Sequence, residues 1–184
     1  ENPGQLSSIR WVPHDFEEEF MGPNEMLVDM RATSLHFKDV LLSMNMVSGF
    51  EPIIGLEGAG SVRVSNDPIY APGEDVMIIS LNSKSWKDSL MGTSAIVSTS
   101  RSMVVRKPQN CSWHEASCTI GVLGTAYYAL YKVAALKRGE TVLIHSAMGG
   151  VGQCAIQIAR KLGAKVIASA GTLEKRRNLL RMDG

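Results

Sequence analysis

The sequence predicts an α/β fold in two parts, a β-rich first part followed by the beginning of a doubly wound parallel sheet. Three observations predict this fold. Short stretches in the first hundred residues alternate apolar and polar side chains, a helix that begins near residue 111 leads into a βαβα pattern, and a glycine cluster lies at the first strand-to-helix junction of that pattern. We expect one domain over residues 1–110 and a second over residues 111–184.

The first part has the pattern of a small antiparallel barrel or sandwich. In "MLVDMRA", Met26, Val28 and Met30 lie on one face of a half-buried strand. Further short strands are expected in "GSVRVS", "DVMIIS" and "SMVVRKP", which turn-forming residues separate. A brief helix is expected to start near Phe37, with apolar residues at helical spacing: Phe37, Val40, Leu41 and Met44.

The second part opens with a helix. Ser112 and Glu115 form an S-x-x-E capping box, and the helix is expected to end at Arg138-Gly139-Glu140. "TVLIHS" follows as a short apolar strand, of the kind that is buried on both faces of a parallel sheet. The helical spacing comes from Ala116, Ile120, Leu123, Tyr127, Leu130 and Ala134.

An amphipathic helix, a strand and a last helix complete the βαβα unit. Gly163 ends the first helix, "AKVIASA" is the second strand, and Thr172 caps a helix that runs to about Met182. A two-stranded parallel start leaves a bare hydrogen-bonding edge. The apolar face of the first helix consists of Val151, Cys154, Ala155, Ile158, Ala159 and Leu162.

Composition excludes several classes of protein. The 184 residues carry a net charge of +1, with 45% apolar and 20% charged residues, which is typical of a soluble globular protein. There is no basic stripe with interleaved aromatics, so we expect no nucleic-acid partner, and no apolar run is long enough for a membrane span.

The cysteines favour the cytoplasm. Cys111, Cys118 and Cys154 are expected to be small buried side chains in a reducing compartment. The start, without Met or a signal peptide, is typical of a segment cut from a longer chain.

The glycine cluster has the spacing Ala147-x-Gly149-x-x-Gly152, a variant of G-x-G-x-x-G. The middle glycine lets a pyrophosphate approach the backbone, and the last one lets helix and strand pack closely. The helix N-terminus adds backbone N–H groups and a positive dipole end. We therefore predict a dinucleotide site; a tight turn without a ligand is the alternative. The predicted contacts are Ala147, Met148, Gly149, Gly150, Val151, Gly152 and Gln153.

The end of the second strand favours NADPH over NADH. An NAD site usually has Asp or Glu there to bind the ribose 2′-hydroxyl, but this strand ends in Ser169, Ala170 and Gly171. A 2′-phosphate would instead be stabilised by charge-assisted hydrogen bonds from the residues that follow. A solvated basic helix face is the alternative. The residues in question are Thr172, Lys175, Arg176 and Arg177.

The segment "LIHSAMGGVGQCAIQIARKLGAKVIASAGTLEKR", preceded by "GTAYYAL", resembles the medium-chain dehydrogenase/reductase superfamily. Within it, the chain resembles the enoyl reductase domains of animal fatty acid synthase and of iterative, highly reducing polyketide synthases. "LHFKDVLLSMNMV", "GLEGAGSV" and "APGEDVM" agree with the same family. Over about Leu6 to Asp183, the resemblance implies a GroES-like catalytic domain and the first βαβα part of a Rossmann domain.

The resemblance also implies a reaction. NADPH-dependent reduction of an α,β-unsaturated thioester on an acyl carrier protein adds hydride to the β-carbon and a proton to the α-carbon. Other synthase domains are implied partners, and a homodimer would form through the whole synthase. Zinc is not expected, because Gly55-Leu56-Glu57 stands where zinc-dependent relatives have "GHE", which leaves Glu57 without partners of metal-binding type.

The resemblance places few candidate catalytic groups in this chain. His36 and Phe37 would line the site; Phe37 has no proton to donate, and a hydrogen-bonded packing role is favoured for His36 over a catalytic one. Thr125 matches a position that lines the nicotinamide site, or it is simply a helix hydroxyl. His145 is expected to pack within its strand, and His114 to face solvent.

No catalytic acid is assigned, because the acid groups of such reductases are expected beyond Gly184. We therefore expect a fragment of a multifunctional synthase, in preference to a natural truncation. Two other functions stay open: a stand-alone quinone or alkenal reductase, and a vestigial, non-catalytic structural domain of a synthase.

Overall fold

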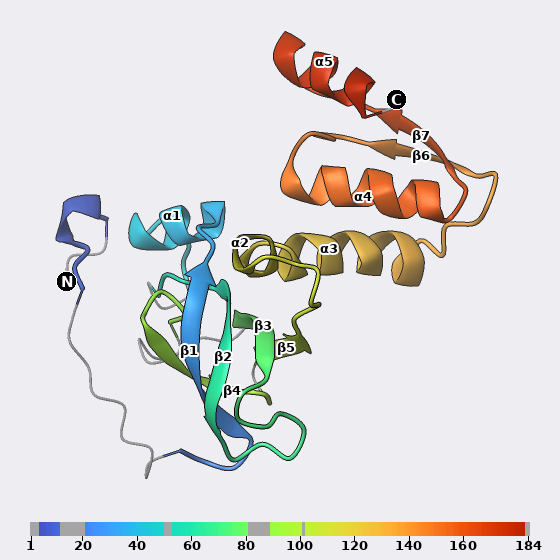
Figure 1. Cartoon of the computed structure of the whole chain (residues 1–184). Helices are drawn as coiled ribbons and strands as arrows, with labels where there is room; N and C mark the ends of the chain where they lie inside the picture. Colours follow the sequence, from blue (N-terminus) through green and yellow to red (C-terminus); the bar gives the residue numbers. More distant parts are fainter. Residues whose placement is uncertain (1–3, 12–20, 50–52, 81–88, 101, 183–184) are drawn as a thin grey trace. The chain divides into compact units, whose positions relative to one another are not determined.

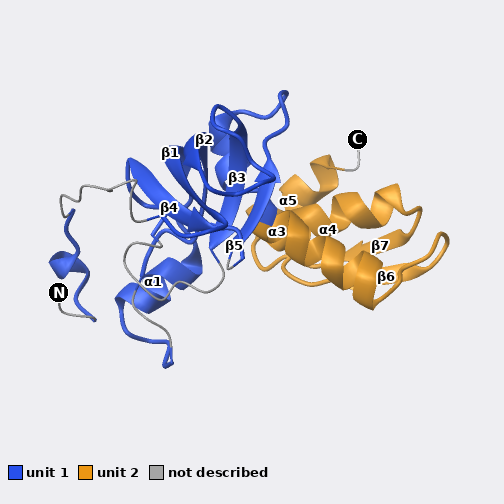
Figure 2. Cartoon of the chain, turned by 90° about the horizontal axis from the view of Figure 1, so that it is seen from below, with its two compact units in different colours: residues 1–120 blue, residues 121–184 orange. Residues whose placement is uncertain are grey.

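The computed structural model describes residues 4–11, 21–49, 53–80, 89–100 and 102–182. The chain divides into two compact units, Glu1–Ile120 and Gly121–Gly184, shown in separate colours in Figure 2. The sequence placed its domain boundary ten residues earlier, after residue 110. Each unit is a separate body with its own apolar core, one built on an antiparallel sheet and the other on a parallel strand pair.

Unit 1 is built on a five-stranded antiparallel sheet with the strand order β4-β1-β2-β3-β5 (Figure 1). The four strands expected from the sequence are present, and β4 is an addition. Two register shifts between β1 and β2, at Leu27/Val28 and Met30/Ala32, are of the kind that bends a sheet. The described residues form one curled sheet and not two packed sheets. The strands are β1 (Glu25–Thr33), β2 (Glu57–Ser65), β3 (Asp75–Ser80), β4 (Ser94–Ser98) and β5 (Ser102–Arg106).

Both faces of this sheet carry buried side chains. One face holds the main core, which includes Met26, Val28 and Ile78. A smaller cluster joins Ala59 and Met77 to Ala116 and Ile120, so that helix α2 (Trp113–Ser117) covers the second face. Because β1 is covered at its start on both sides, Leu27 is as buried as Met26, where a half-buried strand was expected.

Two short helices complete the first part of unit 1. Helix η1 (Leu6–Ser8) is a single 3-10 turn, and helix α1 (Phe37–Ser43) begins where the sequence predicted. Its buried residues are Asp39 and Leu42, whereas Phe37 is 75% exposed, so the predicted apolar face is wrong. The cause is Asp39, whose carboxylate accepts hydrogen bonds from two backbone N–H groups and thereby turns this side of the helix inward.

The long helix expected from Ser112 onward is broken. The capping box is confirmed, because Ser112 Oγ accepts from the N–H of Glu115 and the Glu115 carboxylate accepts from the N–H of Ser112. After α2, the hydroxyl of Ser117 and the thiol of Cys118 both donate to the carbonyl of His114, a local competition that interrupts the helix. It resumes as α3 (Ile120–Tyr127) and continues as a π-helical segment, η4 (Tyr128–Val133).

Unit 2 has the predicted βαβα order: β6 (Thr141–Ile144), α4 (Gly150–Lys161), β7 (Lys165–Ala168) and α5 (Leu173–Arg181). β6 and β7 are parallel, and Val142 and Ile144 pack toward the helices. On the other face, Leu143 and Ile167 are 56% and 57% exposed, so burial on both faces is not observed in the described part of the unit. The helices of unit 2 pack on one side of its sheet only, against the core cluster Ala126, Ile144, Ala147, Ala155 and Ile156.

The predicted apolar face of α4 is largely confirmed, because Ala155 and Ala159 are buried and Cys154 and Ile158 pack against the core of unit 2. Ile156 is buried although the pattern omitted it, whereas Val151 is 43% exposed. Gly163 ends the helix as predicted, in the left-handed region with a φ of 77°. None of the described helices is long and apolar enough to cross a membrane.

The cysteines are free, as expected, but they are not deeply buried. Cys111 and Cys154 are half-buried and Cys118 is exposed, because Cys118 lies at the break between α2 and α3. Although Cys118 is exposed as a residue, its sulfur is partly shielded from water. This partial desolvation, with a smaller effect of the Glu57 charge, raises the pKa of the thiol above its ordinary value.

Gly152 allows the backbones of α4 and the preceding turn to touch. A Cβ atom at this position would lie 2.6 Å from the carbonyl oxygen of Ser146 and 2.7 Å from Cα of Ala147. We predict that Gly152→Ala lowers the free energy of opening of α4 by about 2 kcal/mol, because extra methyl groups in packed sites cost about that much. Hydrogen exchange of the α4 amides measures this change.

Gly124→Ala is the matched control for Gly152→Ala. Nothing lies within 4 Å of a Cβ atom built at Gly124, so alanine there is expected to be neutral or to stabilise α3 by up to about 1 kcal/mol. Equal exchange rates in the two variants would show that close packing at Gly152 is not required.

Candidate functional site

The candidate site is the turn between β6 and α4. Ser146 lies in the left-handed region with a φ of 50°, and the N–H of Gly149 donates to the carbonyl of Ser146 at 2.8 Å. Gly149 is the N-cap of α4 and has no side chain to satisfy the first N–H groups of the helix. The N–H groups of Gly150, Val151 and Gly152 therefore stand at the positive end of a twelve-residue helix, an arrangement that favours an anion.

The glycines of the turn have different roles. A Cβ atom on Gly149 would meet only the carbonyl oxygen of Ser146, at 3.2 Å, whereas one on Gly152 would overlap backbone atoms. Gly152 is therefore required by packing, while Gly149 leaves an open surface at the mouth of the turn. The side-chain amide of Gln153 donates to the carbonyl of Met148 at 3.1 Å and so stabilises the turn.

Hydrogen bonds connect the turn to the end of β7. The N–H of Ala147 donates to the carbonyl of Ser169 at 2.9 Å, and the N–H of Ser169 donates to the carbonyl of Ile144 at 3.0 Å. His145 Nδ1 lies 3.0 Å from the hydroxyl of Ser169. His145 is exposed at the strand end, so the expectation that it packs within the strand is wrong, because β6 ends at Ile144.

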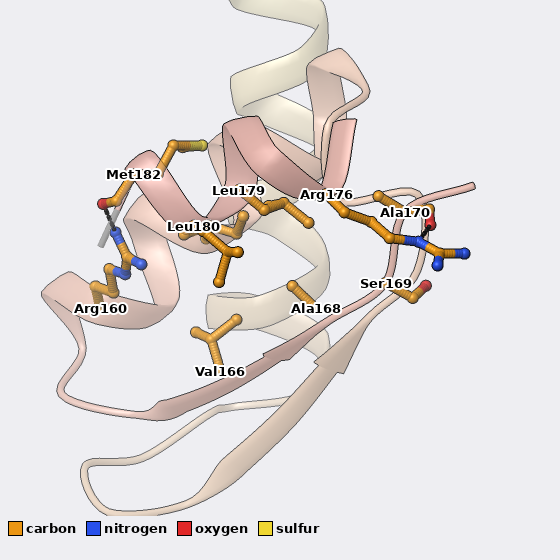
Figure 3. Close-up of a pocket in the computed structure, with 10 residues that line it drawn as sticks. Arg160, Val166, Ala168, Ser169, Ala170, Arg176, Leu179, Leu180 and Met182 are labelled. Atoms are coloured by element: carbon orange, nitrogen blue, oxygen red, sulfur yellow. Dashed lines mark hydrogen bonds between the residues drawn. The ribbon is translucent and has the colours of Figure 1, made fainter. Parts of the chain in front are cut away.

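A cation lies at the end of β7. Figure 3 shows the guanidinium of Arg176 turned back toward the residues that follow the strand, where its Nε donates to the carbonyl of Ala170 at 2.9 Å. Thr172 caps α5 as predicted, since its hydroxyl accepts from the N–H of Lys175 at 3.2 Å. Lys175 is exposed on the same first turn. The structure thus brings Arg176 to the strand end at which the sequence predicted a phosphate.

A pocket of about 460 Å³ lies beneath α5, between α4 and β7 (Figure 3). Two hydrogen bonds link residues that line it: Arg176 Nε donates to the carbonyl of Ala170, and Arg160 Nη1 donates to the carbonyl of Met182 at 2.8 Å. The sequence did not predict the pocket, because its lining comes from three separate elements. The apolar lining consists of Ile156, Val166, Ala168, Leu179, Leu180 and Met182.

The structure also places Thr125 and His114, two residues that the sequence analysis singled out. The hydroxyl of Thr125 donates to the carbonyl of Gly121 at 2.7 Å, one helical turn back, as an ordinary helix hydroxyl does. Its place at a nicotinamide site stays a prediction. His114 is exposed, as predicted.

The candidate residues of unit 1 lie between β1 and α1. His36 is the N-cap of α1, and its Nε2 lies 2.7 Å from Oε2 of Glu57, whose side chain is fully buried. The atoms are at hydrogen-bonding distance, but their angles do not satisfy hydrogen-bond geometry, so we describe the contact as a close electrostatic one. Glu57 therefore does have an imidazole beside it, contrary to the expectation. In the described residues, no three metal-ligating side chains gather into a cluster.

No protein family model matches the chain. In sequence, it is 37% identical over 175 residues to the highly reducing polyketide synthase claI of Penicillium crustosum, an alignment that covers 94% of this chain and 7% of that synthase. It is 36% identical over 185 residues to a mycocerosic acid synthase-like polyketide synthase of Mycolicibacterium smegmatis, covering 98% of this chain and 8% of that one. The chain thus spans a small part of each curated relative.

Solved structures of reductases superpose on most of the chain. The CurK enoyl reductase superposes with a TM-score of 0.82 at 28% identity, over 98% of this chain and 55% of that structure. The Escherichia coli quinone oxidoreductase complexed with NADPH gives a TM-score of 0.75 at 27% identity, over 94% of this chain and 51% of that one. The chain is therefore homologous to a segment of highly reducing polyketide synthases, and it has the fold of about half of a medium-chain dehydrogenase/reductase enoyl reductase.

Proposed function

We propose that this chain is part of an NADPH-dependent enoyl reductase domain of a multifunctional synthase. The proposed reaction adds hydride to the β-carbon and a proton to the α-carbon of an α,β-unsaturated thioester on an acyl carrier protein. The observation that carries the proposal is the open N-terminus of α4 together with Arg176 at the end of β7. A reductase of this kind requires a dinucleotide at that place.

The residues present fit a dinucleotide. The N–H groups of Gly150 and Val151 would donate to a pyrophosphate, and the open surface at Gly149 would let it approach. A Cβ at Gly149 would narrow that approach, and it would meet one protein atom, the carbonyl oxygen of Ser146 at 3.2 Å, which would have to shift slightly. When bound, NADPH supplies the hydride for the reduction. The remaining proposed contacts of the turn are Ala147, Met148, Gly152 and Gln153.

The phosphate at the 2′ position of the ribose would select NADPH. The residues after β7 offer the guanidinium of Arg176, the hydroxyl of Thr172 and the ammonium of Lys175, and the sequence Ser169 to Gly171 contains no carboxylate. A charge-assisted hydrogen bond to a phosphate is about twice as strong as a neutral one.

The relatives support the synthase context. Polyketide synthases are multidomain proteins, so other synthase domains are the proposed partners, with a homodimer formed through the whole synthase. A stand-alone quinone reductase is the second candidate function, because quinone oxidoreductases also superpose on the chain, one of them with a TM-score of 0.80. The intact glycine turn and Arg176 favour an active reductase over a vestigial structural domain.

The strand-end cation generates a prediction about cofactor selectivity. The full-length protein is expected to bind NADPH more tightly than NADH, and Arg176→Ala is expected to weaken NADPH binding at least about tenfold, because hydrogen bonds to charged groups contribute about 1.5–3 kcal/mol. Its affinity for NADH should change less than twofold. Fluorescence titration with both cofactors measures these constants.

Arg181→Ala, an exposed change in the last turn of α5, is the control for Arg176→Ala. It should leave both affinities unchanged. Equal affinity of the unaltered protein for the two cofactors would contradict the assignment of Arg176 to the 2′-phosphate.

The open surface at Gly149 generates a second prediction. Gly149→Val is expected to weaken NADPH binding more than tenfold while leaving the melting temperature within a few degrees, since its φ of −80° suits any residue. Calorimetric titration and thermal melting measure the two effects. An unchanged affinity would mean that the pyrophosphate binds elsewhere.

A further inference from the structure

We propose that the hydroxyl of Ser169 donates a hydrogen bond to the 2′-phosphate of NADPH and that His145 controls this hydroxyl through the proton on its ring. This inference rests on the proposed function and adds a pH-sensitive specificity contact to it. The sequence alone favoured a packing role for His145 and indicated no role for Ser169 beyond a strand end without a carboxylate. The observation that carries the inference is the contact between the two side chains, with 3.0 Å between His145 Nδ1 and Ser169 Oγ.

This side-chain contact is not needed to hold the two strands together. The backbone already joins them at the same place, because the N–H of Ser169 donates to the carbonyl of Ile144 at 3.0 Å and the N–H of Ala147 donates to the carbonyl of Ser169 at 2.9 Å. His145 is exposed, and a hydrogen bond at an exposed position replaces one with water, so it adds little to stability. A role in ligand binding therefore explains the contact better than a role in folding.

Ser169 lies between the two groups that the proposed function assigns to phosphates. Its carbonyl accepts from Ala147 of the glycine turn, and the carbonyl of the next residue, Ala170, accepts from Nε of Arg176 at 2.9 Å. Ser169 and Arg176 line the same pocket, and Figure 3 shows the hydroxyl and the guanidinium at the same end of it. The Nη atoms of Arg176 make no hydrogen bond to the described residues. A phosphate bound to these atoms would have the Ser169 hydroxyl beside it.

The proton on His145 decides what the hydroxyl offers to a ligand. A hydroxyl has one hydrogen and two lone pairs, and imidazole Nδ1 either accepts a hydrogen bond or donates one. When Nδ1 is bare, it takes the hydroxyl hydrogen, and the hydroxyl presents only lone pairs to an anion. When Nδ1 carries a proton, it donates to Ser169 Oγ, and the hydroxyl hydrogen is available for a phosphate oxygen. The doubly protonated ring always has this second arrangement, whereas the neutral ring has it in only one of its two tautomers.

The other charges of the surrounding elements also favour an anion at this strand end. Residues 145–153 and 166–173 contain no charged side chain apart from His145, α4 carries none before Arg160, and α3 and η4 carry only Lys132. A protonated imidazole is stabilised when a negatively charged phosphate binds beside it, so the two events favour each other. The first turns of α5 supply three cations and one carboxylate, all exposed: Glu174, Lys175, Arg176 and Arg177.

Linkage gives the sign of the pH effect. Because the protonated ring makes Ser169 a donor, the affinity for NADPH gains as the pH falls through the range in which an imidazole takes up its proton. The 2′-phosphate itself takes up a proton near about pH 6, which weakens its binding in the same range. The effect of His145 is therefore measured as a difference between the unaltered protein and a variant, in which the titration of the phosphate cancels.

The first test measures the Kd of NADP⁺ and of NAD⁺ by calorimetry, with the full-length protein, at about pH 6 and about pH 8.5. The oxidised cofactors carry the same phosphates as the reduced ones and are stable at both pH values. Ser169→Ala is expected to weaken NADP⁺ binding about tenfold at the lower pH, as the loss of a hydrogen bond to a charged group does, and less than threefold at the higher pH. NAD⁺ binding should change less than twofold at either pH.

Ser169→Thr is the matched control for Ser169→Ala, because threonine keeps the hydroxyl and suits the end of a strand. It is expected to retain the NADP⁺ affinity of the unaltered protein within threefold at both pH values. A loss in Ser169→Ala that is equal at both pH values, or equal for both cofactors, would overturn the proposal. Equal losses in the two variants would also overturn it, because they would indicate packing and not hydrogen bonding.

His145→Gln removes the titrating group and keeps a side chain of similar shape. The ratio of the Kd of NADP⁺ at about pH 8.5 to that at about pH 6 is expected to be at least about threefold larger in the unaltered protein than in His145→Gln. His114→Gln, a change at an exposed histidine of α2, should give the ratio of the unaltered protein. The same ratio in His145→Gln as in the unaltered protein would contradict the control of Ser169 by His145.

The reciprocal effect gives a readout at the ring itself. In protein labelled with ¹⁵N at histidine, saturating NADP⁺ is expected to raise the titration midpoint of His145 by at least about half a pH unit, the equivalent of threefold coupling, and NAD⁺ is not. Ser169→Ala should lose this effect, and an effect that persists would remove Ser169 from the proposal. If the unaltered protein binds neither NADPH nor NADP⁺, the proposed function fails; if it binds them and Ser169→Ala binds NADP⁺ equally well at both pH values, only the present inference fails.

Discussion

The backbone contact between Gly152 and the turn at Ser146 and Ala147 is the constraint on which the candidate site depends. It places the first turn of α4 directly against the end of β6, so that free N–H groups and the positive end of the helix dipole meet at one point. A side chain at Gly152 would separate these elements. The anion site is therefore a consequence of close packing, because the main chain alone forms it.

The same contact organises the neighbouring strand. Ala147 and Ser169 are joined by a backbone hydrogen bond, so the end of β7 lies beside the turn, and Arg176 folds back onto that end from α5. A diphosphate at the turn and a phosphate at Arg176 would thus be bound by elements that share one core. In unit 1, two buried acids fix the position of His36: Asp39 accepts a hydrogen bond from its backbone N–H, and Glu57 lies against its ring.

Much of this arrangement was predictable from local sequence. The βαβα order, the capping box at Ser112 and the cap at Thr172 depend on neighbouring residues and were found in the structure. Contacts between distant residues were not predictable: the break after α2 depends on side-chain bonds to His114, the exposure of Leu143 depends on which face the helices cover, and the approach of His36 to Glu57 joins positions 21 residues apart. The glycine spacing indicated the turn, but no pattern indicated the pocket beneath α5.

The most direct test is a crystal structure of the full-length protein with NADPH. The account predicts diphosphate oxygens within hydrogen-bonding distance of the N–H groups of Gly150 and Val151, and the 2′-phosphate beside the guanidinium of Arg176. A cofactor whose diphosphate lies away from the start of α4, or a turn filled by a protein side chain, would contradict it.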